Sequence, residues 1–91
     1  MSTIRIPPVL RTFVGGVKTV SAEGATLRAV LDSFFATYPA VRQQILTKEG
    51  TLSTFVNVFV DDQDVRYLQG LETPLAAGAT VTLLPAMAGG A

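Results

Sequence analysis

The chain has 91 residues, the size of one small domain. Apolar residues make up 48% and charged residues 15%, which is typical of a globular chain and excludes a disordered one. Seven basic and seven acidic residues cancel, and this argues against nucleic-acid binding, which normally needs a basic excess. Cysteine and histidine are absent, which excludes disulfides, thiolate or histidine metal sites, thiol catalysis and His-based triads.

The N-terminal segment shows no targeting or membrane signal. Pro7 and Pro8 interrupt it before the apolar core of a signal peptide could form. Nowhere does an uncharged apolar run reach the roughly 18 residues that a membrane-spanning helix needs. We therefore expect a cytoplasmic protein with no membrane association.

The first elements in chain order form a hairpin. Residues 3–6 alternate in polarity, which predicts a short strand. The two prolines that follow lack the N–H that a strand ladder needs, so they end it. The dipeptide Gly15-Gly16 predicts a turn, and residues 17–20 predict a return strand joined to the first by an irregular link.

The clearest helix is predicted for residues 27–38, where apolar side chains recur at helical spacing. Thr26 is placed to cap its first turn, and Pro39 ends it, because the residue before proline avoids helical geometry. A short helical turn over residues 40–46 and a surface turn over residues 48–50 follow. The apolar stripe consists of Leu27, Val30, Leu31, Phe34, Phe35 and Tyr38.

The strongest strand is predicted for residues 54–60. Its alternation places three valines on one face and Phe55 and Phe59 on the other. If the helix covers the valines, the two phenylalanines lie on an open sheet face that is available to a partner. The alternative is that a bend in the sheet or a loop covers them.

The remaining segments before the C-terminus are a turn over residues 61–64, a short strand over 65–67, a loop over 70–78 and a last strand over 80–84. The aspartates of the turn match part of a calcium-binding loop, but an arginine stands where the third ligand belongs. We interpret the segment as an acidic β-turn. One main helix can cover only one face of such a sheet, which predicts a two-layer α+β domain.

The last residues are predicted to form a short extension that ends in two glycines and an alanine. It leaves the last predicted strand through Pro85 and ends in Gly89, Gly90 and Ala91. Residues 85–90 can extend roughly 20 Å, and glycine allows the backbone to pass a narrow channel and approach an active site closely. Such a tail can offer its carboxylate to another enzyme, although an inert, frayed end is the alternative.

With these features the chain resembles the ubiquitin-like sulfur carriers, typified by the molybdopterin-synthase small subunit and the thiamine-pathway carrier. The resemblance rests on the order of elements, on residues 81–90 with their Gly-Gly ending, and on residues 55–67, which look closest to the carrier that works with cysteine synthase. Shorter matches are Ile6-Pro7, Leu10-Arg11, Gly24, Thr26-Leu27 and Gly70-Leu71. It implies a β-grasp (ubiquitin-like) fold over residues 1–85, a mixed sheet with one main helix across one face, and a flexible tail over 86–91.

The resemblance also implies a chemistry. An adenylating enzyme of the ubiquitin-activating type uses ATP to adenylate the Gly90 carboxylate, and sulfide or a persulfide then leaves a thiocarboxylate. A PLP-dependent cysteine or homocysteine synthase takes up the sulfur for cysteine or methionine biosynthesis, and a zinc metalloprotease releases the product. The carrier itself is then a protein co-substrate that binds no cofactor and no metal and is not an enzyme.

One departure concerns Ala91, which follows the second glycine. The resemblance implies that the metalloprotease trims Ala91 before activation, and a cloning remnant is the alternative. Three other functions stay open: the molybdopterin-synthase small subunit, a ubiquitin-like modifier joined to lysines, and an interaction module with an inert tail. The implied site consists of Gly90 as the reacting residue, Ala88 and Gly89 as its tail, and Phe55, Phe59 and Met87 as the partner surface.

Overall fold

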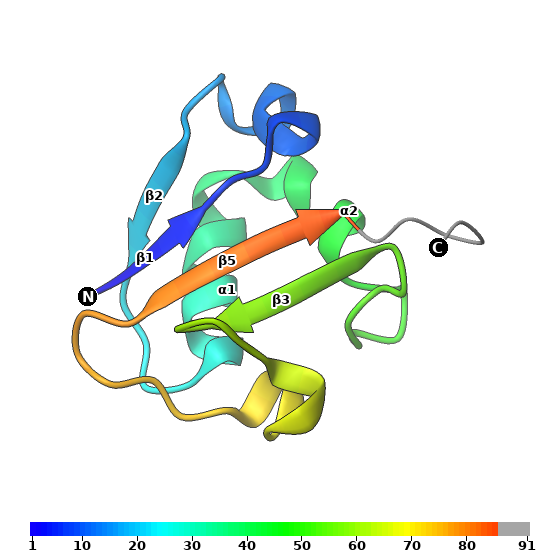
Figure 1. The fold of residues 1–91 in the computed structure, drawn as a ribbon. Helices are drawn as coiled ribbons and strands as arrows, with labels where there is room; N and C mark the ends of the chain where they lie inside the picture. The colour runs from blue at the N-terminus through cyan, green and yellow to red at the C-terminus, as the bar shows by residue number, and fades with distance from the viewer. Residues whose placement is uncertain (86–91) are drawn as a thin grey trace.

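The computed structural model describes residues 1–85. Five strands form one sheet in the order β2-β1-β5-β3-β4, and Figure 1 shows the main helix α1 packed across one face of it. The strands β1 and β5 are parallel and the other neighbours antiparallel, so the expected two-layer α+β fold with a mixed sheet is confirmed. The elements are β1 (Ser2–Arg5), η1 (Pro8–Val14), β2 (Thr19–Ala22), α1 (Leu27–Thr37), η2 (Pro39–Val41), α2 (Arg42–Ile45), β3 (Val56–Val60), β4 (Gln63–Asp64), η3 (Val65–Tyr67), η4 (Gly70–Glu72) and β5 (Thr80–Pro85), where η denotes a 3₁₀ helix.

The core lies between the sheet and α1. Alternate residues of the strands point toward the helix, as the period of two requires, and the five buried residues of α1 recur at helical spacing. The predicted inward faces are confirmed, because Val81 is fully buried and Leu83 is 1% exposed. The inward strand residues are Ile4, Val56, Val58, Val60, Val81 and Leu83, and those of α1 are Leu27, Val30, Leu31, Phe34 and Phe35.

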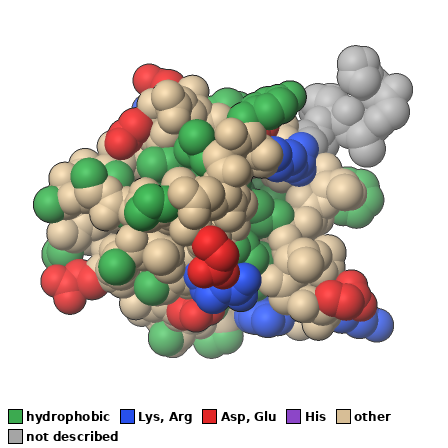
Figure 2. All heavy atoms as spheres, turned by 90° about the horizontal axis from the view of Figure 1, so that it is seen from below, with side chains coloured by type: hydrophobic (Ala, Val, Ile, Leu, Met, Phe, Trp, Pro, Cys, Tyr) green, Lys and Arg blue, Asp and Glu red, His purple; other side chains and the backbone are tan. Residues whose placement is uncertain are grey.

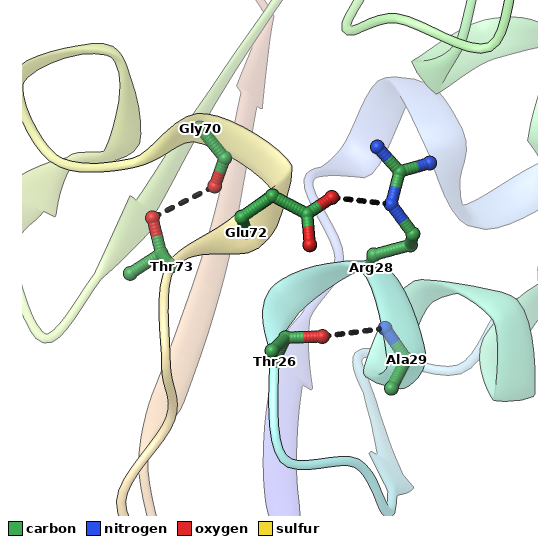
Figure 3. Close-up of polar contacts among 6 residues, drawn as sticks. All are labelled: Thr26, Arg28, Ala29, Gly70, Glu72 and Thr73. Carbon is green, nitrogen blue, oxygen red and sulfur yellow. Dashed lines mark hydrogen bonds and ion pairs between the residues drawn. The ribbon is translucent and has the colours of Figure 1, made fainter.

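The start of α1 is tied to the segment that precedes β5 (Figure 3). The hydroxyl of Thr26 accepts a hydrogen bond from the Ala29 N–H at 3.3 Å, which confirms the predicted N-cap. Arg28 and Glu72 form an ion pair of 2.6 Å between α1 and η4, and because both are half exposed it contributes at most about 1 kcal/mol. The buried hydroxyl of Thr73 donates to a carbonyl of η4 at 2.7 Å.

The acidic turn joins β3 to β4. Asp61 and Asp62 adopt left-handed φ angles of 49° and 73°, which aspartate tolerates better than most residues. The turn is shorter than predicted, because Gln63–Asp64 already pairs with β3 as β4. Residues 1–85 contain no group of three acidic side chains that could hold a metal ion.

Further segments differ from the sequence prediction: the return strand β2 spans Thr19–Ala22 and not residues 17–20, and the loop predicted over residues 70–78 begins with η4. The expected strand over residues 65–67 is the 3₁₀ helix η3, because the Asp64 side chain accepts a hydrogen bond from the Arg66 N–H at 2.9 Å and caps a helical turn. The irregular link after β1 is also helical, η1, with Pro8 in its first turn. No helix within the described part of the chain is long and apolar enough to cross a membrane.

Candidate functional site

The strand β5 positions the candidate site, because the predicted tail follows its last residue. It lies in the middle of the sheet, with β1 hydrogen-bonded on one side and β3 on the other. Burial changes abruptly along it: Leu83 is 1% exposed, whereas Leu84 is 44% exposed and Pro85 is also exposed. The central strand therefore ends at the surface, and in Figure 1 it runs from lower left to upper right and ends beside α2.

The predicted tail residues lie outside the part of the chain that the structure describes. These residues are Met87, Ala88, Gly89, Gly90 and Ala91. Their roles stay predictions, as does the division into a domain over residues 1–85 and a tail over 86–91. The structure does describe the surroundings from which the tail leaves.

An apolar hollow of about 190 Å³ adjoins the end of β5. Pro85 forms one wall. Two large apolar side chains beside it are exposed to solvent, Val9 of η1 by 59% and Phe55 by 67%. Exposed apolar groups that gather around one point are a frequent mark of a contact surface. The complete lining is Val9, Leu10, Gln44, Phe55, Val56 and Pro85.

The position of Phe55 differs from the prediction. The strand β3 begins only at Val56, because the Ser53 hydroxyl accepts a hydrogen bond from the Phe55 N–H at 3.1 Å and holds this segment in a turn. Phe55 consequently lines hollows together with residues of η1 and α2. The prediction that Phe55 and Phe59 share one face of one strand is wrong.

Phe59 lies within β3 as predicted. Its neighbours across the sheet are Thr82 of β5 and Asp64 of β4, and its side chain is partly buried. Its alternation with buried Val58 and Val60 places it on the sheet face opposite α1. The roles of Phe55 and Phe59 in partner binding stay predictions.

Two apolar residues beside the end of β5 did not emerge from the sequence reasoning. Leu84 could have been found, because the alternation that buries Val81 and Leu83 turns Leu84 outward. Val9 could not, because η1 has no periodic pattern and its proximity to Pro85 depends on the tertiary fold.

The acidic side chains that make hydrogen bonds in the described part serve the fold. Asp61 accepts from the Thr80 N–H at 3.0 Å, Asp64 caps η3, and Glu72 pairs with Arg28. Chemically, the arrangement can present the end of the chain to another protein, with an apolar contact surface at its base.

Comparison with known proteins gives a consistent result. The model of the ThiS family matches residues 4–90. Sulfur carrier protein CysO of Mycobacterium tuberculosis is 46% identical over 90 residues, 97% of each chain. The crystal structure of M. tuberculosis CysO matches with a TM-score of 0.89 and 43% identity, over 96% of this chain and 100% of that one.

Two further structures are similar. A chain in the crystal structure of the Amycolatopsis orientalis BexX/CysO complex matches with a TM-score of 0.91 and 41% identity, over 99% of this chain and 100% of that one. Small archaeal modifier protein 1 of Methanosarcina acetivorans matches with a TM-score of 0.84 and 26% identity, over 98% and 95% of the two chains. The β-grasp fold implied by the resemblance is thereby confirmed. Since the family model and the CysO similarity both span nearly the whole sequence, the chain belongs to the ThiS family of ubiquitin-like sulfur carriers and is a homologue of CysO.

Proposed function

We propose that this chain is a sulfur carrier protein that bears its sulfur as a thiocarboxylate on Gly90. The observation that supports it most directly is that the ThiS-family match runs to residue 90 and leaves Ala91 outside. The similarity to proteins named sulfur carriers over 97% of the chain agrees with this role. The fold is also suited to it, because a central strand leads the chain outward at Pro85.

The proposed reaction begins with removal of Ala91 by a zinc metalloprotease. The Gly90 carboxylate then attacks the α-phosphorus of ATP on an adenylating enzyme, which forms the acyl-adenylate and releases pyrophosphate. Sulfide attacks the acyl carbon, the bond to the phosphate oxygen breaks, and AMP leaves. With sulfide as the donor, no atom is oxidised or reduced. With a persulfide as the donor, the product is an acyl disulfide, and a thiol reductant must cleave it to leave the thiocarboxylate.

The acceptor in this proposal is an activated amino acid. A PLP-dependent cysteine or homocysteine synthase supplies it, and the thiocarboxylate sulfur adds to it. Hydrolysis of the conjugate by the metalloprotease returns the carrier with a free Gly90 carboxylate. The carrier supplies no catalytic group, which is compatible with a chain that lacks histidine and cysteine.

Partner binding at the base of the tail is part of the proposal. A structure similar to this chain is that of a BexX/CysO complex, so a homologous fold is known in a complex with another protein. The apolar hollow beside Pro85, with exposed Val9 and Phe55, is suited to such a contact. We therefore place the docking surface of the adenylating enzyme there.

The intact mass of the protein from its native cells tests the proposal. We expect the loss of one alanine and, in part of the sample, replacement of one oxygen by sulfur. An unchanged chain, even under sulfur starvation, would contradict it and favour an interaction module. Isopeptide adducts of higher mass would instead indicate a modifier, a role that the similarity to small archaeal modifier protein 1 favours. Stable co-purification with a large catalytic subunit would indicate a molybdopterin-synthase role.

A truncation provides the matched control. Deletion of Gly90 and Ala91 should abolish thiocarboxylate formation, because the chain then ends at Gly89 and its terminal carboxylate is one residue short of the reacting position. The circular dichroism spectrum and the unfolding midpoint should not change, because both residues follow the last strand. Sulfur incorporation into this truncated chain at the normal rate would exclude Gly90 as the reacting residue.

A further inference from the structure

Basic side chains gather at the end of β5. Although the chain is neutral overall, a hollow of about 550 Å³ beside Leu84 is lined by Arg5, Arg11 and Lys18 and by no acidic residue. Leu84 directly precedes Pro85, which forms the wall of the apolar hollow. The basic hollow and the apolar hollow are therefore neighbours at the base of the tail.

A second basic hollow lies on the other side. It has a volume of about 670 Å³ and is lined by Arg42 and Lys48 together with Phe55, again with no acidic residue. Phe55 also lines the apolar hollow with Pro85. The apolar surface is thus flanked on both sides by cations, and we call this set the basic rim: Arg5, Arg11, Lys18, Arg42 and Lys48.

These cations have no acidic partner within residues 1–85, where the one ion pair joins Arg28 to Glu72. Glu49, beside Lys48 in the surface turn, is the acidic residue adjacent to the rim in sequence. Most acidic groups of the sheet lie at its other end, where Asp61 binds the first residue of β5. Figure 2 views the molecule from below the orientation of Figure 1, and on that face acidic and basic side chains are interspersed.

We infer that the partner that takes up the tail presents an apolar contact flanked by carboxylates, and that the basic rim recognises these. The inference rests on the proposed function, because it concerns the surface that docks the adenylating enzyme. An interface of this kind has an apolar centre and a polar periphery. Opposite charges around the centre accelerate encounter and fix orientation more than they add affinity. Several exposed cations of one sign produce such steering collectively, although each alone is weak.

The test uses the chain from which Ala91 has been removed and the adenylating enzyme of the same organism, with pyrophosphate release as the readout. Lys18→Glu and Arg42→Glu each reverse one exposed charge of the rim, one on either side of the apolar hollow. The control Ser21→Glu/Gln63→Glu lowers the net charge by the same amount through two exposed residues at the other end of the sheet. Arg11 is left unchanged, because its Nε–H donates to the Ile6 carbonyl at 3.2 Å and supports the fold.

We expect kcat/KM for adenylation at low salt to fall about tenfold in each rim variant and to stay unchanged in the control. Added salt should lower kcat/KM of the wild type, because it screens the attraction between the rim and the partner's carboxylates. The effect on the rim variants should be smaller, because the substitutions have already weakened this attraction. Equal activity of the rim variants and the wild type, or an equal decrease in the control, would overturn the inference while the proposed function stands. Absence of any adenylation of the trimmed wild type would overturn both.

Discussion

The two ends of β5 differ in how they are held. At its start, Asp61 binds Thr80 twice: its N–H donates to the Thr80 carbonyl at 2.9 Å, and its carboxylate accepts from the Thr80 N–H at 3.0 Å. The N–H of Gly78 also donates to the Met1 carbonyl at 3.1 Å. At the other end, Leu84 and Pro85 are exposed beside an apolar hollow and beside cations that have no acidic partner among residues 1–85.

This difference separates two tasks within one strand. The held end connects β5 to the β3–β4 turn and to the N-terminus, so changes there should affect the free energy of unfolding. At the open end Leu84 and Pro85 pair with β3 through the backbone, but their side chains are exposed, so side-chain changes there should affect partner binding while stability is preserved. This separation suits a carrier, because other proteins can bind and modify its tail while the domain stays folded.

The largest effect on stability is expected at Gly24, near the held end. A Cβ placed there would lie 2.5 Å from the Val30 backbone nitrogen and 2.7 Å from the Ala29 Cβ, which is too close for any side chain. Gly24→Ala should therefore lower the free energy of unfolding by about 2 to 3 kcal/mol, measured by urea denaturation. Gly16→Ala is a useful comparison, because a Cβ there meets no atom within 4 Å and only the φ of 84° is unfavourable. A Gly24→Ala protein as stable as the wild type would show that α1 does not need this close approach.

A smaller effect is expected at Asp61, which joins the start of β5 to the turn. Asp61→Ala removes the carboxylate that accepts from Thr80 and places alanine at a left-handed φ of 49°. We expect a loss of about 1 to 2 kcal/mol in the free energy of unfolding, with unchanged adenylation of the folded protein. Asp61→Asn retains an acceptor and tolerates the same backbone, so it should be nearly as stable as the wild type. If the asparagine variant were as unstable as the alanine variant, the carboxylate charge and not the hydrogen bond would matter.

The features that were predictable from sequence are those with a regular period. The stripe of α1 and the alternation in β3 and β5 indicate burial directly, and Thr26 and Pro39 mark the helix ends by local chemistry. The helices η1 and η3 have no such period. They form because Pro8 suits the first turn of a helix and Asp64 caps one, signals that compete with strand propensity in Val65 and Tyr67.

The surroundings of the tail were only partly predictable. The tail itself stands out in sequence because its glycines follow a strand and a proline. The basic rim does not, because it combines residues from β1, η1, the segment before β2, α2 and the turn after α2 that are far apart in the chain. Phe55 was assigned to a strand because the Ser53 hydrogen bond that holds it in a turn has no periodic signature.

The smallest effect on stability, and the sharpest test of the comparison, is expected at Phe55. Because the side chain is 67% exposed, Phe55→Ala should change the free energy of unfolding by less than about 0.5 kcal/mol. It should nevertheless lower kcat/KM for adenylation about fivefold, because large aromatic groups at the centre of an interface provide much of its binding energy. The matched control is Tyr67→Ala, which removes an aromatic group that is 88% exposed and lines none of the hollows at the end of β5. Equal losses of activity in both variants, or a marked loss of stability in Phe55→Ala, would show that the end of β5 beside Pro85 is not a surface for recognition that is independent of stability.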